Sequence, residues 1–286
     1  MRVACFAAFF VLSLAAAGQS VPAAIYTDPP RDPAHPASMT VLHIPTHGVE
    51  INGVQYAPPG ATRHPTLLIC HGLPGNEKNL DLAQAVRRAG WNAVTFNYRG
   101  SWGSAGNFRF AQNVEDAAAV LTYLRNPANA ARLGIDVDRI AIAGHSMGGW
   151  VAVHTAAHDH ALLGAILISA ADMGALADGG KEKLTAMMQD DKEALAGVTA
   201  ESMAEEIVAN AKAFRFAGAI DGLSHTPMLV LSANDGLAAG TDALIQAVKR
   251  NGNQRVTAIH EDTDHVWSDR RIFLESTVIT WLDTLH

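Results

Sequence analysis

The chain has 286 residues, and 49% of them are hydrophobic, which is enough to bury one large core rather than two independent ones. Its formal net charge is −7 at pH 7, with 21 Lys and Arg residues against 28 Asp and Glu residues. The basic residues form no cluster, so the composition argues against a nucleic-acid partner.

The first twenty residues have the pattern of an export signal. Arg2 gives a positive start, residues 3–17 form an apolar run, and small residues at 15–18 offer a cleavage site near Ala17. A transmembrane anchor is the alternative, but the apolar run is shorter than the ~18–20 residues that a spanning helix needs. We therefore expect residues 1–20 to be a signal peptide, with export to the periplasm or the cell exterior and no stable membrane insertion.

The sequence contains two cysteines. Cys5 lies in the predicted signal and leaves with it, so Cys70 remains alone and no intramolecular disulfide is expected, even in an oxidising compartment. Cys70 falls inside a predicted strand, where it is most simply a small core residue.

From residue 21 onward the chain alternates strand-like and helix-like segments, which predicts a single domain over residues 21–286. A Pro-rich lead-in is followed by a predicted hairpin over residues 40–44 and 49–56. Six further strands are predicted at Thr66–Cys70, Asn92–Phe96, Ile140–Ala143, Ala165–Ser169, Met228–Leu231 and Arg255–Ile259. Helices are predicted at Asn79–Ala89, Val114–Arg125, Gly149–His158, Thr241–Asn251 and Arg270–Leu285. This order predicts an α/β fold, a mostly parallel eight-stranded sheet with helices on both faces.

A nucleophile elbow is predicted at Gly144-His145-Ser146-Met147-Gly148. The motif stands between a buried strand and a helix rich in small residues, as a G-x-S-x-G elbow requires. The serine must take a positive φ so that its hydroxyl projects from the sheet, and the flanking glycines leave room for the sharp turn. Ser146 is therefore the candidate nucleophile.

Two backbone N–H groups are candidates for an oxyanion hole. Met147 begins the helix after the serine, so its N–H is free to face a developing negative charge. Leu73, in the glycine-bearing loop after Thr66–Cys70, is the most plausible second donor. His71 in the same loop is a possible base, but a structural histidine bonded to backbone is the better interpretation.

The acid and the base are expected after later strands, because in parallel sheets the site lies at the strands' carboxyl ends. Asp235 follows Met228–Leu231 and is the candidate acid, with Asp172 as the alternative. His265 lies far enough past the last strand to reach the serine, whereas His260 stands at the strand end. In the run 260–265, His, Asp and Glu suggest a metal site, but six consecutive loop residues rarely converge on one ion, so we expect no metal and no cofactor.

Residues 172–223 form an insertion that is longer than a simple crossover. Helical stretches at Lys181–Gln189 and Ala200–Phe214 carry an apolar stripe, which predicts either a cap over the serine or an ordinary packed crossover. In the cap interpretation, Met187 and Met188 line the substrate pocket. Trp102 and Trp267 are the other candidate pocket residues.

These motifs together resemble the α/β-hydrolase superfamily. The resemblance runs over His71-Gly72, Gly144-x-Ser146-x-Gly148, Asp235 and His265, and Phe96-Asn-Tyr-Arg-Gly is similar to single-domain feruloyl-type esterases and to prolyl-oligopeptidase-like and serine-aminopeptidase-like hydrolases. It implies a serine hydrolase that acts on a small-molecule ester, with a peptidase or amidase using the same residues as the alternative. A catalytically silent binding module and an acyltransferase also remain open.

Overall fold

A computed structural model describes residues 21–285 of the chain, so the predicted signal peptide lies outside the described residues. Eight strands form one sheet in the order β1-β2-β4-β3-β5-β6-β7-β8, and β2 is antiparallel to both of its neighbours whereas β4, β3 and β5–β8 run parallel. The strands are β1 (Ser38–Thr46), β2 (Val49–Ala57), β3 (His64–Cys70), β4 (Asn92–Phe96), β5 (Ile135–His145), β6 (Ala165–Ile168), β7 (Met228–Ala233) and β8 (Val256–Glu261). The predicted α/β class and mostly parallel eight-stranded sheet are confirmed.

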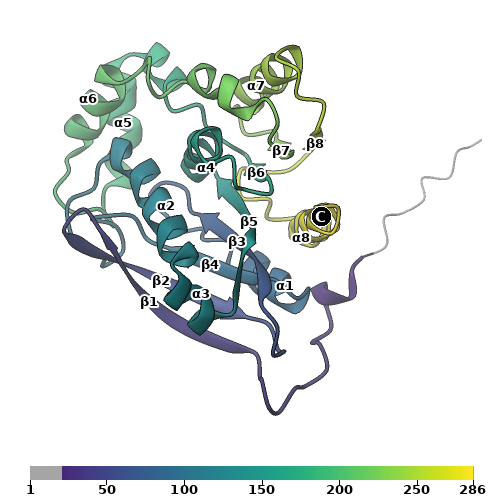
Figure 1. Ribbon diagram of the computed structural model, residues 1–286. Helices are drawn as coiled ribbons and strands as arrows, with labels where there is room; N and C mark the ends of the chain where they lie inside the picture. Colours follow the sequence, from purple (N-terminus) through teal and green to yellow (C-terminus); the bar gives the residue numbers. More distant parts are fainter. Residues whose placement is uncertain (1–20, 286) are drawn as a thin grey trace, which may run out of the picture.

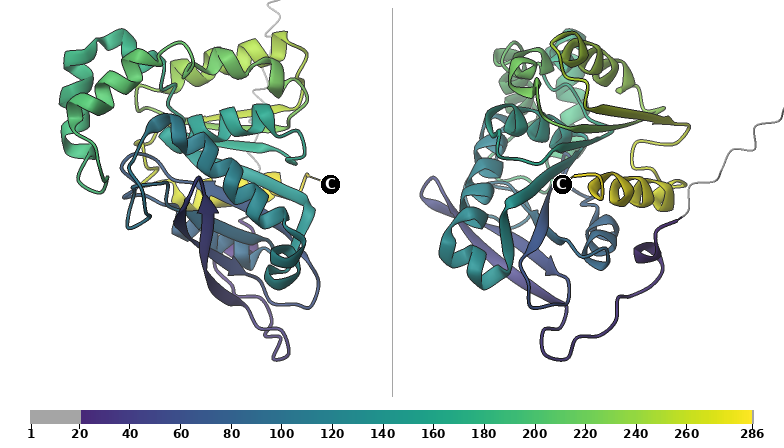
Figure 2. Two further views of the ribbon diagram at one scale, coloured as in Figure 1. Left: turned by 60° about the vertical axis from the view of Figure 1, so that its left-hand side comes forward. Right: turned by 45° about the vertical axis from the view of Figure 1, so that its right-hand side comes forward.

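Helices cover both faces of this sheet (Figures 1 and 2). The helices are α1 (Leu80–Arg88), α2 (Phe110–Arg125), α3 (Pro127–Leu133), α4 (Met147–His158), α5 (Lys181–Asp191), α6 (Ala200–Ala209), α7 (Ala238–Arg250) and α8 (Arg271–Leu282). Helices α1 and α8 bury their apolar residues on one face, and α2, α3, α4 and α7 bury theirs on the other. The central strands are apolar on both sides because helices cover both.

Strand β5 is central, and this decides where its carboxyl end lies. It pairs in parallel with β3 on one side and with β6 on the other. It begins five residues earlier than Ile140, because Ile135 already pairs with His64. The turn after β5 therefore opens in the middle of the sheet edge, beside the loop after β3.

Helix α3 was not predicted from the sequence. It begins with Pro127 in the first helical turn, and the Asn126 side chain caps it by accepting hydrogen bonds from the N–H groups of Ala128 and Asn129. Both are ordinary start signals for a helix. The segment is only seven residues long, so its apolar periodicity is too short to identify.

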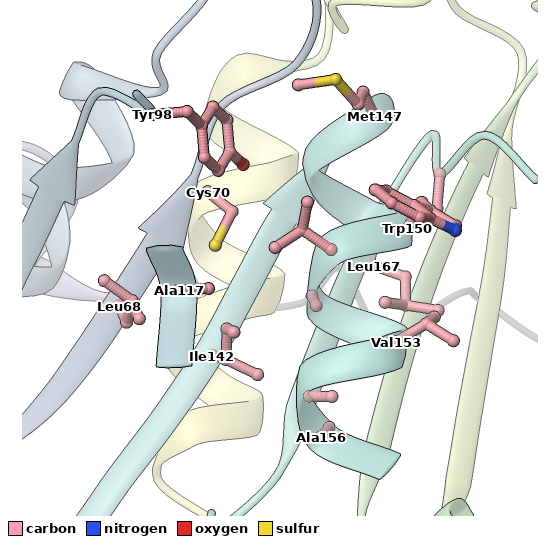
Figure 3. Close-up of a cluster of buried hydrophobic side chains, with 14 of the residues drawn as sticks. Leu68, Cys70, Tyr98, Ala117, Ile142, Met147, Trp150, Val153, Ala156 and Leu167 are labelled. Carbon is pink, nitrogen blue, oxygen red and sulfur yellow. The ribbon is translucent and has the colours of Figure 1, made fainter. Parts of the chain in front are cut away.

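The packing of α4 on the sheet forms the centre of the larger core (Figure 3). Eleven of its residues are buried, among them Trp150 and Val153, which belong to the same core cluster as Ile142 and Leu167 of the strands. A helix buried on this scale is fixed rigidly, because protein interiors are close-packed. The first turn of α4 is therefore a rigid support for the residue that precedes it.

The insertion at 172–223 folds into α5, α6 and short 3₁₀ turns at Ala175–Gly179, Phe216–Ala219 and Asp221–Leu223. Helices α5 and α6 pack together at one end of the molecule (Figure 2). Buried side chains of the insertion, Leu184, Met203, Ile207 and Phe214, belong to the same core cluster as Trp150. Within residues 21–285, no helix combines the length and apolar composition that crossing a bilayer requires.

Candidate active site

Ser146 stands on a strained turn between β5 and α4. Its backbone has φ 57° and ψ −122°, a conformation that a residue with a side chain rarely adopts. A Cβ on Gly144 would lie 1.9 Å from the Gly148 carbonyl oxygen, and one on Gly148 would lie 2.1 Å from that of Cys70. Only glycine fits at these two positions, so the sequence motif and the geometry of an elbow agree.

Asp235 and His265 are joined by a hydrogen bond just past the carboxyl ends of β7 and β8. Nδ1 of His265 lies 2.8 Å from Oδ2 of Asp235, and the Leu237 N–H donates to Oδ1 of the same carboxylate. Burial alone would raise the pKa of Asp235, but the hydrogen bonds from His265 and from the Leu237 N–H hold it below the ordinary value. The carboxylate is therefore ionised and fixes the proton of His265 on Nδ1, which leaves Nε2 free to accept one.

The residue before the serine connects these two groups. Nε2 of His145 lies 2.9 Å from the backbone oxygen of His265, and the centroids of the two imidazole rings are 4.7 Å apart. His265 therefore lies against the immediate neighbour of Ser146. The structure brings Asp235 and His265 into contact across 30 positions of sequence, and it places the main chain of His265 against the residue that precedes Ser146.

The loop after β3 lies directly beside the serine. A Cβ on Gly72 would be only 2.9 Å from Cβ of Ser146. The backbone of this loop therefore lies so close to the nucleophile that a residue with a side chain would not fit at position 72. Leu73 follows Gly72 in that loop, and Met147 is the first residue of α4, so its N–H has no acceptor within the helix. Both candidate oxyanion donors thus belong to segments that flank Ser146.

His71 is held inside the protein rather than presented to a substrate. Its Nδ1 bonds to the Gly72 carbonyl oxygen at 2.7 Å, its ring packs on Tyr98, and only 2% of its surface is exposed. Burial lowers the pKa of His71 to about 4. The interpretation as a structural histidine bonded to backbone agrees with these contacts.

The two alternative site residues have other partners. Asp172 accepts hydrogen bonds from the N–H groups of Gly174, Ala175 and Phe216, and so closes the two ends of the insertion on each other. His260 lies on β8 and bonds to Ser232 and Asn234. Neither contacts His265 or the elbow in these bonds. Within the described part of the chain, no three His, Cys, Asp or Glu side chains are placed to hold a metal ion.

The four predicted pocket residues divide into two pairs. Trp102 is 39% exposed and Met187 is 43% exposed, whereas Met188 and Trp267 are 1% and 0% exposed. Trp267 packs in the core between the sheet and helices α1 and α8, where its Nε1 donates to Ser169. The prediction that Met188 and Trp267 line a substrate pocket is corrected, because neither has surface left for a ligand.

Trp102 borders a hollow of about 690 Å³, here called the Trp102 hollow. Its walls are Pro74 and Asn76 of the loop beside Ser146, the turn 100–104, and residues 193–196 of the insertion. Nε1 of Trp102 donates to the Pro74 carbonyl oxygen at 2.7 Å, which fixes the indole against the loop beside the serine. Pro74, which borders the hollow, directly follows Leu73 in this loop.

The insertion is fastened to the turn 100–104 by backbone hydrogen bonds. The Trp102 N–H donates to Ala194, the Ala196 N–H donates to Gly100, and the Phe108 N–H donates to Ala196. The turn itself is anchored from below, because Arg99 bonds to the fully buried carboxylate of Asp116 at 2.6 Å. Arg99 therefore braces the turn 100–104 against α2.

Sequence reasoning missed the contact of His145 with His265. His145 was visible only as the variable second residue of the elbow motif, and nothing in the motif indicates where its side chain points. The missed signal is the position of His145 at the end of β5. Successive side chains of a strand point to opposite faces of the sheet, so this position predicts the face on which the imidazole lies.

The comparisons with known proteins agree with the fold. A family model described as alpha/beta hydrolase fold matches residues 71–269, so the chain belongs to the alpha/beta hydrolase fold family. It is 34% identical over 107 residues to an uncharacterized 31.7 kDa protein of Escherichia coli from the traX-finO intergenic region, and the match spans 36% of each chain.

Among solved structures, the fold is similar to esterases of the fungus Rhizomucor miehei, with a TM-score of 0.67 and 18% identity over 92% of this chain and 86% of that one. It is also similar to the acylaminoacyl peptidase of Pyrococcus horikoshii, with a TM-score of 0.67 and 15% identity over 87% of this chain and 41% of that one. At these identities, the likeness shows the fold.

Proposed function

We propose that the protein is an exported serine hydrolase that cleaves carboxylic esters of small molecules through an acyl-enzyme intermediate on Ser146. The observation that carries the proposal is the 2.8 Å contact of His265 with Asp235 beside a serine held at φ 57°. The family and the similar esterase structures support the same reaction class. Residues 1–20 support export by their sequence pattern.

In the proposed reaction, Nε2 of His265 takes the proton of the Ser146 hydroxyl as the oxygen attacks the ester carbonyl. The carbonyl oxygen becomes an oxyanion, which the N–H groups of Met147 and Leu73 stabilise, and each donor contributes about 3–4 kcal/mol to lowering the barrier. The imidazolium then protonates the leaving alcohol, and the acyl group stays on Ser146. Water, activated by His265, hydrolyses the acyl-enzyme and regenerates the serine.

The charge of Asp235 makes this proton transfer favourable. The imidazolium that forms on His265 lies next to an ionised carboxylate, which stabilises the positive charge during each half-reaction. The histidine also keeps one tautomer, since the Nδ1 proton remains on the Asp235 side.

A peptidase or amidase is the second candidate, because the fold is also similar to an acylaminoacyl peptidase. A panel of acyl nitrophenyl esters and aminoacyl nitroanilides separates the two. Ester turnover with amide turnover at least ~10³-fold lower supports the esterase, and the reverse order supports the peptidase. Adding a second alcohol to the ester reaction detects acyl transfer as a new ester product.

Replacement of the nucleophile tests the proposal as a whole. Ser146→Ala is expected to lower kcat by a factor of about 10⁵–10⁶, with an unchanged thermal midpoint. Failure of a fluorophosphonate to label the wild type would support a non-catalytic binding module instead. Export is checked separately by N-terminal sequencing of the mature protein, for which a start within a few residues of Gly18 is expected.

A further inference from the structure

We propose that His145 is a positioning residue that fixes the backbone of His265 relative to Ser146, a role that rests on the proposed function. His145 is the last residue of β5 and directly precedes the nucleophile, so its position is set by the centre of the sheet. Only 4% of its surface is exposed. Its imidazole therefore serves contacts inside the protein.

The hydrogen bond determines which ring nitrogen carries the proton. A backbone carbonyl oxygen only accepts, so the 2.9 Å contact with His265 requires an N–H on Nε2 of His145. Nδ1 is then an unprotonated acceptor, and it is buried with no hydrogen-bond partner within residues 21–285. It faces the oxyanion loop, since a Cβ on Gly72 would lie 3.4 Å from it.

An unpaired buried acceptor is unfavourable by about 1–3 kcal/mol, so its retention beside the nucleophile points to a function for the ring. The function is visible in the other contacts. Asp235 holds the side chain of His265, and His145 holds its main chain, so the catalytic imidazole is fixed from two directions. The two rings also pack together at 4.7 Å and 44°.

The histidine suits this position because it remains neutral there. Burial and the neighbouring His265 lower the pKa of His145 to about 4. A positively charged residue would repel the imidazolium that forms on His265 when it takes the serine proton. A neutral N–H donor fixes the main chain without opposing that charge.

Three substitutions at this position form the test. The amide nitrogen of Gln reaches the place of Nε2, whereas the amide nitrogen of Asn corresponds to Nδ1 and does not reach the carbonyl. We expect His145→Asn and His145→Leu to lower kcat by about 10- to 100-fold with KM changed less than about threefold, because small misplacements of a catalytic group have effects of this size. His145→Gln is expected to restore kcat to within about fivefold of wild type.

His154→Gln is the matched control, a buried histidine on α4 outside the site. Its kcat is expected to be unchanged. The rate of fluorophosphonate labelling of Ser146 should fall in parallel with kcat in the Asn and Leu variants. If Leu fails to fold, the comparison of Gln with Asn still decides, because both are polar and small enough for the cavity.

Folded Asn and Leu variants with wild-type kcat overturn the positioning role while leaving the proposed function intact. Equal losses in Gln and Asn also overturn it, since they indicate a packing role for the ring. A wild-type protein that turns over no ester and takes up no probe overturns the proposed function, and this role with it. The Ser146→Ala variant separates these cases, because it must be inactive whatever the role of His145.

Discussion

At the scale of single residues, the central feature is the hydrogen bond of Asp235 with His265. Asp235 is nearly buried, with 4% of its side chain exposed, and it accepts from both His265 and the Leu237 N–H. A buried carboxylate beside a histidine, at the ends of two neighbouring strands, supports the proposed roles of Asp235 as the acid and His265 as the base. Asp172 has the same chemistry but bonds only to backbone N–H groups of the insertion.

Replacing Asp235 by its amide should therefore lower the activity while the shape of the site is kept. Asp235→Asn keeps the shape of the side chain but favours the wrong tautomer of His265, so kcat is expected to fall by about 10³- to 10⁴-fold. The measurement is steady-state kinetics on a nitrophenyl ester. The control Asp172→Asn should retain kcat within about fivefold. A larger loss at Asp172 than at Asp235 would reverse the assignment of the acid.

The glycines of the elbow also belong to this scale. A Cβ on Gly144 would overlap the Gly148 carbonyl oxygen at 1.9 Å. That oxygen belongs to the backbone of the same tight turn, so it cannot move away as the end of a flexible side chain could. We expect Gly144→Ala to lower the free energy of unfolding by about 3 kcal/mol or more, measured by urea denaturation. Gly218→Ala is the control, because no atom lies within 4 Å of its added Cβ. Equal stability of the two variants would contradict the strained turn.

At the scale of elements, the insertion and the turn 100–104 together form walls of the Trp102 hollow, next to Pro74 of the loop after β3. Backbone bonds from Trp102 to Ala194 and from Ala196 to Gly100 join the two segments. Met188, on α5, is packed into the main core. The side of the insertion that carries residues 193–196 is thus held in place and forms one wall of the Trp102 hollow.

Trp102 is expected to control substrate size through this wall. Trp102→Ala should lower kcat/KM for esters of bulky alcohols by about tenfold, the equivalent of about 1.4 kcal/mol of lost contact, and leave ethyl or methyl esters nearly unchanged. The measurement is a series of esters with one acyl group and increasing alcohol size. Tyr26→Ala, at an exposed aromatic residue, is the control. A uniform loss across the series would show that Trp102 supports the loop and does not contact the alcohol.

The strands and most helices of this fold follow from sequence patterns, but several side-chain directions do not. Buried apolar runs identify β3 to β7 because both faces of the sheet are covered. The elbow was recognisable because its glycines are required by close backbone contacts. Trp267 was mistaken for a pocket residue because its position near His265 in the chain says nothing of the face on which it packs, and its side chain lies in the core under α1 and α8.

The insertion shows the same limit on a larger scale. The helical spacing of its apolar residues predicted α5 and α6, and both helices are present. The same stripe is consistent with a cap and with a packed crossover, because spacing identifies a buried face and not the surface that buries it. His145 could not be assigned for a related reason, since its partner lies 120 residues later in the chain.

At the scale of the whole molecule, three buried histidines make stability depend on pH. Burial lowers the pKa values of His71, His145 and His154 to about 4, from the ordinary 6.5 of an exposed histidine. Between pH 6.5 and 4 the unfolded chain binds protons that the folded protein does not, so the free energy of unfolding falls as the pH falls through this range.

Each such histidine contributes up to about 1.4 kcal/mol per pH unit in this window. Chemical denaturation at pH 7, 6, 5 and 4.5 measures the slope of the unfolding free energy against pH. His154→Gln is expected to reduce this slope by the equivalent of about one proton. The variant is expected to leave the thermal midpoint at pH 8 nearly unchanged. A slope that is the same in the variant would show that His154 is already protonated in the folded protein.

The proposed acyl-enzyme is tested most directly by intact-protein mass spectrometry during reaction with a fluorophosphonate and, separately, with a slowly hydrolysed ester. We predict one adduct per chain, located by proteolysis on the peptide that contains Ser146, absent from Ser146→Ala and formed much more slowly in His265→Ala. An adduct on any other residue, or full labelling of Ser146→Ala, would contradict the account.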